Sequence, residues 1–116
     1  MDSCIFCNIA AGLSPARILY QDAQVIAFHD IRPLAPVHLL VAPRQHIESL
    51  NQAGPQDEAL LGHMLLVARQ LAQQEGIAQS GYRLVINTGS DGGQTIFHLH
   101  LHILGGKRIA YPLRDL

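Results

Sequence analysis

Three histidines alternate with leucines in the segment His98-Leu99-His100-Leu101-His102, and this alternation constrains the fold more than any other feature of the chain. Successive side chains of a β-strand point to opposite faces, so the spacing predicts a strand with three imidazoles on one face, roughly 6 to 7 Å apart. The two leucines would then face a hydrophobic core. Because buried polar groups need partners, the pattern favours a functional site over a merely solvated strand face.

The rest of the chain is typical of an α+β domain with short turns between its strands. The five predicted strands span residues 17–20, 25–28, 38–41, 82–86 and 96–104. Pro36 and Pro43 bound the third of these strands. The two predicted helices span residues 4–11, closed by Gly12, and residues 55–75, where apolar residues recur with the helical period. We therefore expect one domain over residues 1–116, built on a five-stranded antiparallel sheet with one long and one short helix.

Composition narrows the partners that this chain can have. Apolar residues make up 48% of the 116 positions and charged residues 15%, which provides ample material for a core and indicates that a partner subunit covers some apolar surface. The net charge is −1 and the sequence holds no run of Lys or Arg, so a polymeric nucleic acid is excluded as a partner. No apolar run approaches the ~20 residues of a membrane span, and residues 1–4 do not resemble a secretion signal. We expect a cytoplasmic protein without a membrane partner.

A row of imidazoles and the glycine-rich loop before it indicate phosphate chemistry. Near neutral pH an imidazole can act as nucleophile, proton donor or hydrogen-bond donor, and a phosphate surrounded by histidines uses all three. Residues 87–95 contain three glycines, whose backbone amides could converge on an anion, and Asn87, Ser90 and Thr95, which add neutral donors. The simpler alternative for such a loop is a plain turn between strands.

A catalytic metal on the histidines is a rival interpretation, because two histidines at a spacing of two commonly bind zinc or iron. Carboxylate ligands are the missing part of such a site. Asp91 and the distant Asp30 are the only candidates, and neither has a diagnostic spacing. We therefore expect no catalytic metal.

The segment from Gly93 to Ile103, which holds the pattern His-x-His-x-His followed by two apolar residues, resembles the histidine triad (HIT) superfamily. Residues 82–87 and Gly105-Gly106 resemble its Hint branch, the nucleoside phosphoramidases, as do residues 27–38 and 43–47. The resemblance covers most of the chain, from about residue 4 to residue 106.

The resemblance implies a role for each matching position. His100 would attack the α-phosphorus of a nucleotide through a neutral imidazole, oriented by a backbone carbonyl, and form a covalent nucleotidyl-histidine. His102 would contact the phosphate and assist the leaving group, while His98 completes the triad and His38 lines the same pocket. Asp30 would bind the ribose hydroxyls. The residues that match positions around the base are Ile5, Phe6, Ile9, Phe28 and Ile31, and those that match phosphate contacts are Asn87, Gly93 and Thr95.

Cys4 and Cys7 form half of a tetrahedral zinc site, which needs four ligands. In the bacterial members that this sequence resembles, the pair is completed by histidines at the positions of His46 and His98. Such a zinc would be structural, and it would prevent His98 from donating a proton. The alternative is a pair of buried cysteines one helical turn apart.

The resemblance implies a homodimeric purine nucleoside phosphoramidase that cleaves phosphorus–nitrogen bonds of nucleoside monophosphate–amine conjugates, with the sheet continued across the dimer. Two alternatives remain: a dinucleoside polyphosphate hydrolase, disfavoured because essentially only Lys107 and Arg108 are basic near the triad, and a nucleotide-binding regulator with little turnover. The C-terminal residues 109–116 depart from the Hint pattern because they contain no tryptophan, and this segment shapes leaving-group selectivity in that branch.

Overall fold

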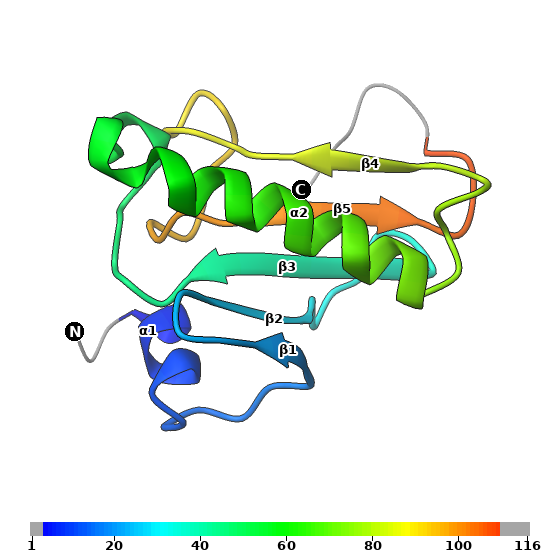
Figure 1. Cartoon of the computed structure of the whole chain (residues 1–116), viewed down its shortest axis with the longest axis horizontal. Coiled ribbons are helices and arrows are strands. Elements are labelled where there is room, and N and C mark those ends of the chain that lie inside the picture. Colours follow the sequence, from blue (N-terminus) through cyan, green and yellow to red (C-terminus); the bar gives the residue numbers. More distant parts are fainter. Residues whose placement is uncertain (1–3, 110–116) are drawn as a thin grey trace.

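The computed structural model describes residues 4–109, so our expectations for the extreme N-terminus and for residues 110–116 lie outside the described residues. The chain forms a strand-rich domain with helices on both faces of a sheet (Figure 1). In chain order, its elements are α1 (Ile5–Ala10), β1 (Ile18–Gln21), β2 (Val25–His29), β3 (Val37–Pro43), the 3-10 turns η1 (Leu50–Gln52) and η2 (Pro55–Asp57), α2 (Glu58–Gln74), β4 (Tyr82–Val85) and β5 (Leu101–Gly105).

The five strands form one antiparallel sheet in the order β1-β2-β3-β5-β4, which confirms the predicted fold class. β3 and β5 lie at its centre, and Leu39 of β3 is paired with Ile103 of β5. The connection between β3 and β4 carries α2 across one face of the sheet (Figure 1). β5 then returns to the centre, between β3 and β4, which brings the histidines to the middle of the sheet.

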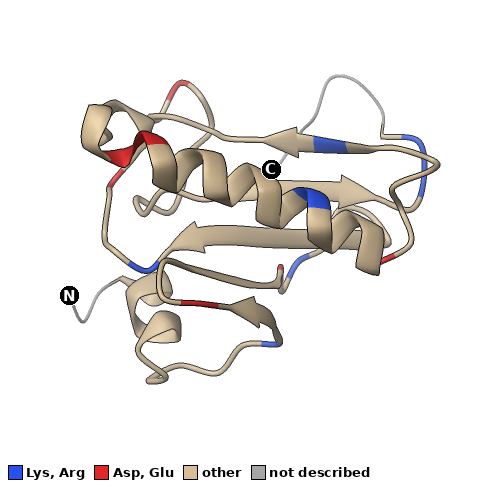
Figure 2. Ribbon diagram, in the orientation of Figure 1, with Lys and Arg blue, Asp and Glu red and all other residues tan. Residues whose placement is uncertain are grey.

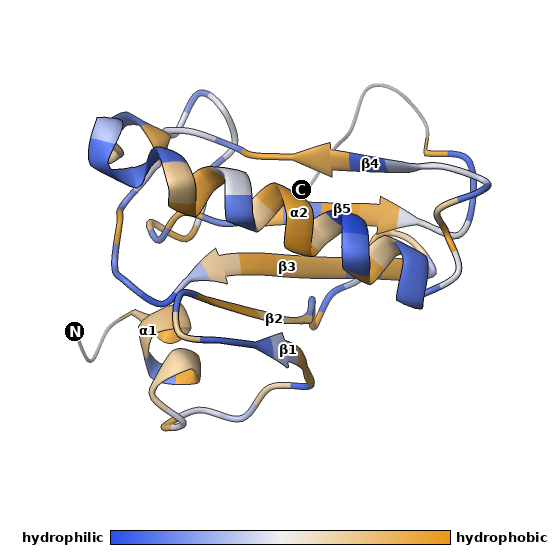
Figure 3. Ribbon diagram, in the orientation of Figure 1, coloured by the Kyte–Doolittle hydropathy of each residue, from blue (hydrophilic) through white to orange (hydrophobic). Residues whose placement is uncertain are grey.

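The long helix α2 lies across one face of the sheet, and both hydrophobic and hydrophilic residues occur along its length (Figure 3). Its buried residues, spaced by three and four, are Leu60, Met64, Val67, Ala68, Leu71 and Ala72. They pack against buried residues of β2, β3 and β5, including Leu39, Leu99, Leu101 and Ile103. The predicted range of 55–75 was too long by one turn, because Pro55–Asp57 is a 3-10 turn in which Asp57 accepts a hydrogen bond from the Gly54 amide at 3.0 Å.

A second and smaller core lies on the opposite face of the sheet, where α1 packs. Phe6 and Ile9 of α1 are buried against Ile26, Phe28, Leu40 and Ala42. The helix begins after Cys4, whose thiol accepts a hydrogen bond from the Cys7 amide, and ends at Ala10 shortly before Gly12, which has a φ of +76°. This short helix covers only one end of that face, so the remaining part stays open.

The histidine segment is the main correction to the predicted strands. Only Leu101–Gly105 pairs in the sheet, whereas residues 96–100 approach it without a ladder. Leu99 donates its amide hydrogen to the Ile47 carbonyl at 2.7 Å, a tertiary contact in place of a strand partner. The predicted alternation nevertheless holds, because the leucines join the α2 core and the histidines lie on the other face.

Pro43 was expected to lie outside the third strand but is its last residue, paired with Val25. A proline is tolerated there because the ladder ends at this position and Arg44 supplies the next backbone bond, to Gln24. The Pro43 carbonyl is then available to a side chain of the histidine segment.

The charged side chains of the described residues are dispersed over strands, loops and both ends of α2 rather than gathered in one basic stripe (Figure 2). Among residues 4–109, no helix combines the length and apolar character that a bilayer crossing requires.

Candidate functional site

A cavity of about 1050 Å³ opens on the face of the sheet opposite α2. The predicted site residues that line it are Phe6, Asp30, Ile31, His38, Asn87, Gly93, Thr95, His100 and His102. They come from α1, from the loop after β2, from β3, from the glycine-rich loop, and from β5 and the segment just before it. Segments that lie far apart in the sequence therefore meet at one site.

Strand register explains why these side chains share the cavity. His102 is paired with Leu40 of β3 and with Val85 of β4, so the three side chains form a row across the sheet. The next row on the same face contains His38 and Arg83, because each is paired with Leu104. His38 therefore lies next to the triad although it is distant in sequence.

His100 is buried and has a single defined tautomer. Its Nδ1–H donates to the backbone carbonyl of His98 at 2.7 Å, so the lone pair is on Nε2. Burial lowers the pKa of His100 below its usual value, against smaller opposing effects of this carbonyl and of Asp30. The Phe6 ring packs edge-on against the imidazole, with ring centroids 5.0 Å apart. The result is a neutral, oriented imidazole of the kind that a nucleophile requires.

A chain of hydrogen bonds also fixes the tautomers of His38 and His102. The Leu34 amide donates to Nδ1 of His38 at 3.1 Å, so the proton of a neutral His38 is on Nε2. This Nε2 lies 2.9 Å from Nδ1 of His102, to which it donates. His102 therefore carries its own proton on Nε2. Burial, followed by the neighbouring His100 and His38, lowers the pKa of His102 to about 3, so this residue is neutral and acts as a hydrogen-bond donor.

Asp30 lies immediately after β2 and lines the cavity next to His38. One carboxylate oxygen accepts the Arg32 amide at 2.8 Å, and the other lies 3.4 Å from Nε2 of His38. A carboxylate can accept further hydrogen bonds from hydroxyl groups.

The ligand atoms of Asp30, His38 and His102 all lie within 4.8 Å of one another, a grouping that a metal ion could in principle use. The Leu34 amide argues against that use, since it places the His38 proton on Nε2, the nitrogen that would have to bind the ion.

The glycine-rich loop differs from the predicted amide cradle. The amides of Gly92 and Gln94 donate to the Gly89 carbonyl, and the amide of Gly93 donates to the Ser90 carbonyl, so all three are used within the loop. The buried Gln94 side chain organises the loop by accepting from the Gly89 amide and donating to the carbonyls of residues 48 and 96. Its side-chain role was not apparent from the sequence. The loop thus presents Asn87 and Thr95 to the cavity from a rigid frame.

Cys4, Cys7, His46 and His98 form a second cluster beside the cavity, with ligand atoms all within 4.8 Å of one another. The Nδ1 of His98 lies 3.3 Å from the Cys4 sulfur, 3.5 Å from the Cys7 sulfur and 3.2 Å from Nδ1 of His46. Tetrahedral zinc, with bonds of about 2.3 Å to sulfur and 2.0 Å to nitrogen, would give nitrogen–nitrogen and nitrogen–sulfur distances of roughly 3.3 and 3.5 Å. The four side chains therefore fit a zinc ion.

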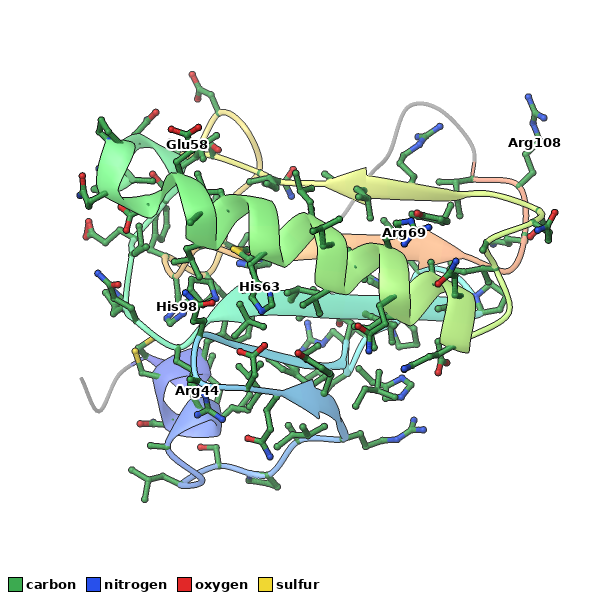
Figure 4. The ribbon with its side chains drawn as sticks, in the orientation of Figure 1. Arg44, Glu58, His63, Arg69, His98 and Arg108 are labelled. Atoms are coloured by element: carbon green, nitrogen blue, oxygen red, sulfur yellow. The ribbon has the colours of Figure 1, made fainter. Side chains whose placement is uncertain are left out.

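The Nδ1 of His98 lies within 3.5 Å of a ligand atom of each of the other three residues, and Figure 4 shows this histidine near the end of β3. Its Nε2–H donates to the Pro43 carbonyl at 2.7 Å, which leaves Nδ1 free to act as a ligand. Both ring nitrogens are therefore committed outside the cavity. Burial, reinforced by the neighbouring Cys4 thiol, raises the pKa of Cys7 to about 11, so a thiolate there requires a cation nearby.

The remaining predicted residues lie behind or beside the cavity wall. Phe28 and Ile9 are buried, and the Phe28 ring supports Phe6 at a centroid distance of 5.3 Å. Ile5 is 42% exposed and does not line the cavity.

The sequence patterns did not identify two cationic residues that line the cavity. Arg32 and Arg83 line it, whereas Lys107 and Arg108, expected near the triad, do not. Arg83 alternates with the core-packed Tyr82 and Leu84, a signal that could have placed it on the histidine face.

Known proteins resemble this chain over nearly its whole length. An uncharacterised HIT-like protein from Synechococcus elongatus is 51% identical over 108 residues, which cover 93% of this chain and 94% of that protein. The crystal structure of a HIT family hydrolase from Legionella pneumophila has a TM-score of 0.93 and 47% identity, covering 95% of this chain and 98% of that one.

Two further solved structures are similar, both with a TM-score of 0.81. One is a Zn-bound histidine triad family protein from Mycobacterium smegmatis, which is 30% identical over 95% of this chain and 81% of that one. The other is a histidine triad nucleotide-binding protein from Candida albicans, 27% identical over 98% of this chain and 86% of that one. The sequence model of the HIT domain matches residues 11–109. The chain therefore belongs to the HIT, or histidine triad, family.

Proposed function

We propose that this protein is a nucleotide hydrolase of the Hint type, a purine nucleoside phosphoramidase that breaks the phosphorus–nitrogen bond of nucleoside 5′-monophosphate conjugates. The observation that carries the proposal is the neutral, buried His100, whose Nδ1–H is bound to the His98 carbonyl and whose Nε2 lone pair is free to attack phosphorus. Membership of the HIT family and the similarity to a HIT family hydrolase and a histidine triad nucleotide-binding protein support this class of activity.

In the first step, Nε2 of His100 forms a bond to the α-phosphorus as the phosphorus–nitrogen bond breaks. The leaving amine takes up a proton, and His100 becomes a nucleotidyl-imidazolium whose Nδ1–H remains on the His98 carbonyl. In the second step, water attacks the phosphorus and loses a proton, the Nε2–phosphorus bond breaks, and neutral His100 is restored. The hydrogen bond to His98 holds the ring in one orientation throughout both steps.

His102 donates a hydrogen bond to the substrate phosphate and becomes a proton donor only when that anion is bound. Its pKa of about 3 is far too low for a general acid in the free protein. A negative charge about 4 Å away, at an effective dielectric constant of ~20, favours the protonated form by about 4 kcal/mol. The bound phosphate therefore raises the pKa of His102, and this rise allows the residue to protonate the leaving amine.

The nucleoside would extend from the triad toward Asp30 and α1. Asp30 accepts hydrogen bonds from the ribose hydroxyls, with its carboxylate oriented by the Arg32 amide. Phe6 and the strongly exposed Ile31 flank the base, while Asn87 and Thr95 contact the phosphate.

A dinucleoside polyphosphate hydrolase is the second candidate. Arg32 and Arg83 supply the cavity with cationic charge that the sequence did not reveal, and a long phosphate leaving group would use such charge.

We also propose that Cys4, Cys7, His46 and His98 hold a structural zinc ion. Their converging ligand atoms and the zinc-bound relative from Mycobacterium smegmatis support this assignment. With four protein ligands the ion leaves no position for substrate, and it ties α1 to the segment that carries the nucleophile.

We further propose a homodimer that continues the sheet through β4. Within residues 4–109, β4 pairs only with β5, and all four of its residues are half-buried. Leu65 and Leu66 on α2 are 48% and 65% exposed, an apolar surface that suits a second copy of the chain.

Hydrolysis of adenosine 5′-phosphoramidate should depend on His100. His100→Ala should lower kcat by roughly 10⁴-fold, because no other neutral imidazole replaces the oriented nucleophile. His63→Ala, on α2, is the matched control and should retain activity. Equal rates in wild type and His100→Ala, or loss of activity in the control, would contradict the assignment of His100 as nucleophile. Nucleotide binding without turnover would instead favour a regulatory protein.

Binding of a singly charged phosphate ester should cause proton uptake by His102. An adenosine 5′-methylphosphonate monoester carries one fixed charge, so a rise in the pKa of His102 from about 3 implies net proton uptake when the ester binds at acidic pH. Titration calorimetry in two buffers of different ionisation enthalpy measures this uptake. Uptake that persists in His102→Asn would assign the proton to another group.

Purified wild-type protein should contain one zinc ion per chain. Cys4→Ser and Cys7→Ser should lose the metal and lower the free energy of unfolding by at least about 2.7 kcal/mol, the effect of a ligand at 100 times its Kd. Metal analysis and urea unfolding check both effects, with His63→Ala as a control for the metal content. A metal-free wild type whose stability does not change on adding zinc would disprove the site.

Sedimentation equilibrium should give a dimer for wild type. Leu66→Glu should shift it toward monomer, because a buried unpaired carboxylate is costly, whereas Leu13→Glu, at a leucine that is 76% exposed near α1, should remain dimeric. A monomeric wild type would rule out the proposed interface.

A further inference from the structure

The proposed metal site and the cavity meet at the N-terminal end of α1. The cysteine–histidine cluster consists of Cys4, Cys7, His46 and His98. Phe6 lies between the two cysteines in sequence, and its side chain is buried and lines the cavity. The Phe6 ring packs edge-on against His100, with ring centroids 5.0 Å apart. One short segment therefore carries two ligands of the proposed zinc ion and one wall of the proposed nucleotide site.

The histidine half of the cluster is positioned by the rest of the fold. Nε2 of His98 donates to the Pro43 carbonyl at 2.7 Å, and the Leu99 amide donates to the Ile47 carbonyl, also at 2.7 Å. The second bond joins the residue after His98 to the residue after His46. Neither bond uses a ligand atom of the cluster, so the backbone of this half does not depend on a metal ion for its position.

The cysteine half belongs to α1, a short helix that depends on tertiary contacts. Its six residues are well below the roughly 12 to 15 at which isolated helices become marginally stable. At its C-terminal end, the Arg44 guanidinium donates to the Ala10 carbonyl at 2.8 Å (Figure 4). At its N-terminal end, the cysteines attach the first turn to the histidine segments.

A metal ion would strengthen this second attachment. The contacts between the two sulfurs and the two imidazoles span 3.2 to 3.5 Å, and a thiol is only a weak hydrogen-bond donor. Zinc would replace these contacts by bonds to both thiolates, and the free energy of such binding also stabilises the structure around the ligands. The ion would thereby hold the first turn of α1 in place, and with it the Phe6 ring against His100.

We propose that zinc binding to the cysteine–histidine cluster strengthens nucleotide binding in the cavity, with Phe6 as the positioning residue that links the two sites. The inference rests on the proposed function, because it joins the proposed zinc ion to the proposed nucleoside monophosphate. A ligand binds more tightly when the wall that it contacts is already in its binding conformation. The coupling is reciprocal, so a bound nucleotide tightens zinc binding by the same factor.

Titration calorimetry with adenosine 5′-monophosphate (AMP) measures the coupling in the full chain, first stripped of metal by a chelator and then loaded with one equivalent of zinc. Zinc should lower the Kd of AMP by about 5- to 150-fold, the usual range for coupled sites. Saturating AMP should lower the Kd of zinc, measured by competition with a chromophoric chelator, by the same factor. Both readouts are independent of turnover.

Two variants of α1 test the role of Phe6. Phe6→Leu should bring the coupling factor close to unity, because leucine keeps an apolar side chain but lacks the ring that packs against His100. Ile9→Val is the matched control, since Ile9 is buried in the same small core on the same helix but does not line the cavity. This control should keep the wild-type factor.

A chain that carries both Cys4→Ser and Cys7→Ser tests where zinc acts. Its affinity for AMP should not respond to zinc. The variant retains the group of Asp30, His38 and His102 in the cavity, so an effect of zinc that persists in it would assign the effect to a metal ion at that group and overturn the proposal.

Equal AMP affinity of the metal-free and zinc-loaded wild type would also overturn the coupling. If zinc acted only by keeping the whole chain folded, Phe6→Leu would show the same factor as wild type, and this result would overturn the linking role of Phe6. A zinc-loaded wild type that binds no AMP would instead overturn the proposed nucleotide site, and a wild type that binds no zinc would overturn the proposed metal site.

Discussion

The hydrogen bond from Nδ1 of His100 to the backbone carbonyl of His98 is the interaction on which the site depends. It selects the tautomer of His100, and it makes the orientation of this ring follow the position of His98. The His98 ring is held in turn by the Pro43 carbonyl at the end of β3 and lies against the two cysteines of the α1 region. One residue therefore joins the central sheet, the N-terminal helix and the nucleophile, through its ring on one side and its carbonyl on the other.

The two faces of the sheet carry different parts of the molecule: the main hydrophobic core lies on the α2 face and the candidate site lies on the opposite face. The α2 side is a continuous apolar core that fixes the strands, and the alternation of side chains places every polar group of the central strands on the opposite side. Burial on that side lowers the pKa values of His100 and His102 and so favours their neutral forms, as a nucleophile requires. Under the proposed function, the substrate phosphate would raise the pKa of His102, so that substrate binding and protonation are linked.

Sequence patterns predicted the parts of the molecule that depend on local periodicity. The apolar period of α2 and the alternation around His100 were sufficient to predict a helix on one face and histidines on the other. The predicted start of β5 was wrong because the Leu99 amide donates a hydrogen bond to the Ile47 carbonyl, a contact between segments that are distant in sequence. Arg83 was missed for a similar reason, since only the register of β4 against β5 shows that it shares the histidine face. The prediction that backbone amides of the glycine-rich loop bind an anion was wrong, because the Gln94 side chain forms hydrogen bonds to the loop backbone and to the carbonyl of residue 48.

The central claim is that Nε2 of His100 becomes bonded to phosphorus during turnover. Rapid quenching of the wild-type protein with adenosine 5′-phosphoramidate, followed by mass spectrometry of its peptides under alkaline conditions that preserve phosphorus–nitrogen bonds, tests it most directly. The account predicts one adenylyl group per active chain, located on His100 and removed on further incubation. Turnover without any adduct, or an adduct on His102 or His38, would contradict it.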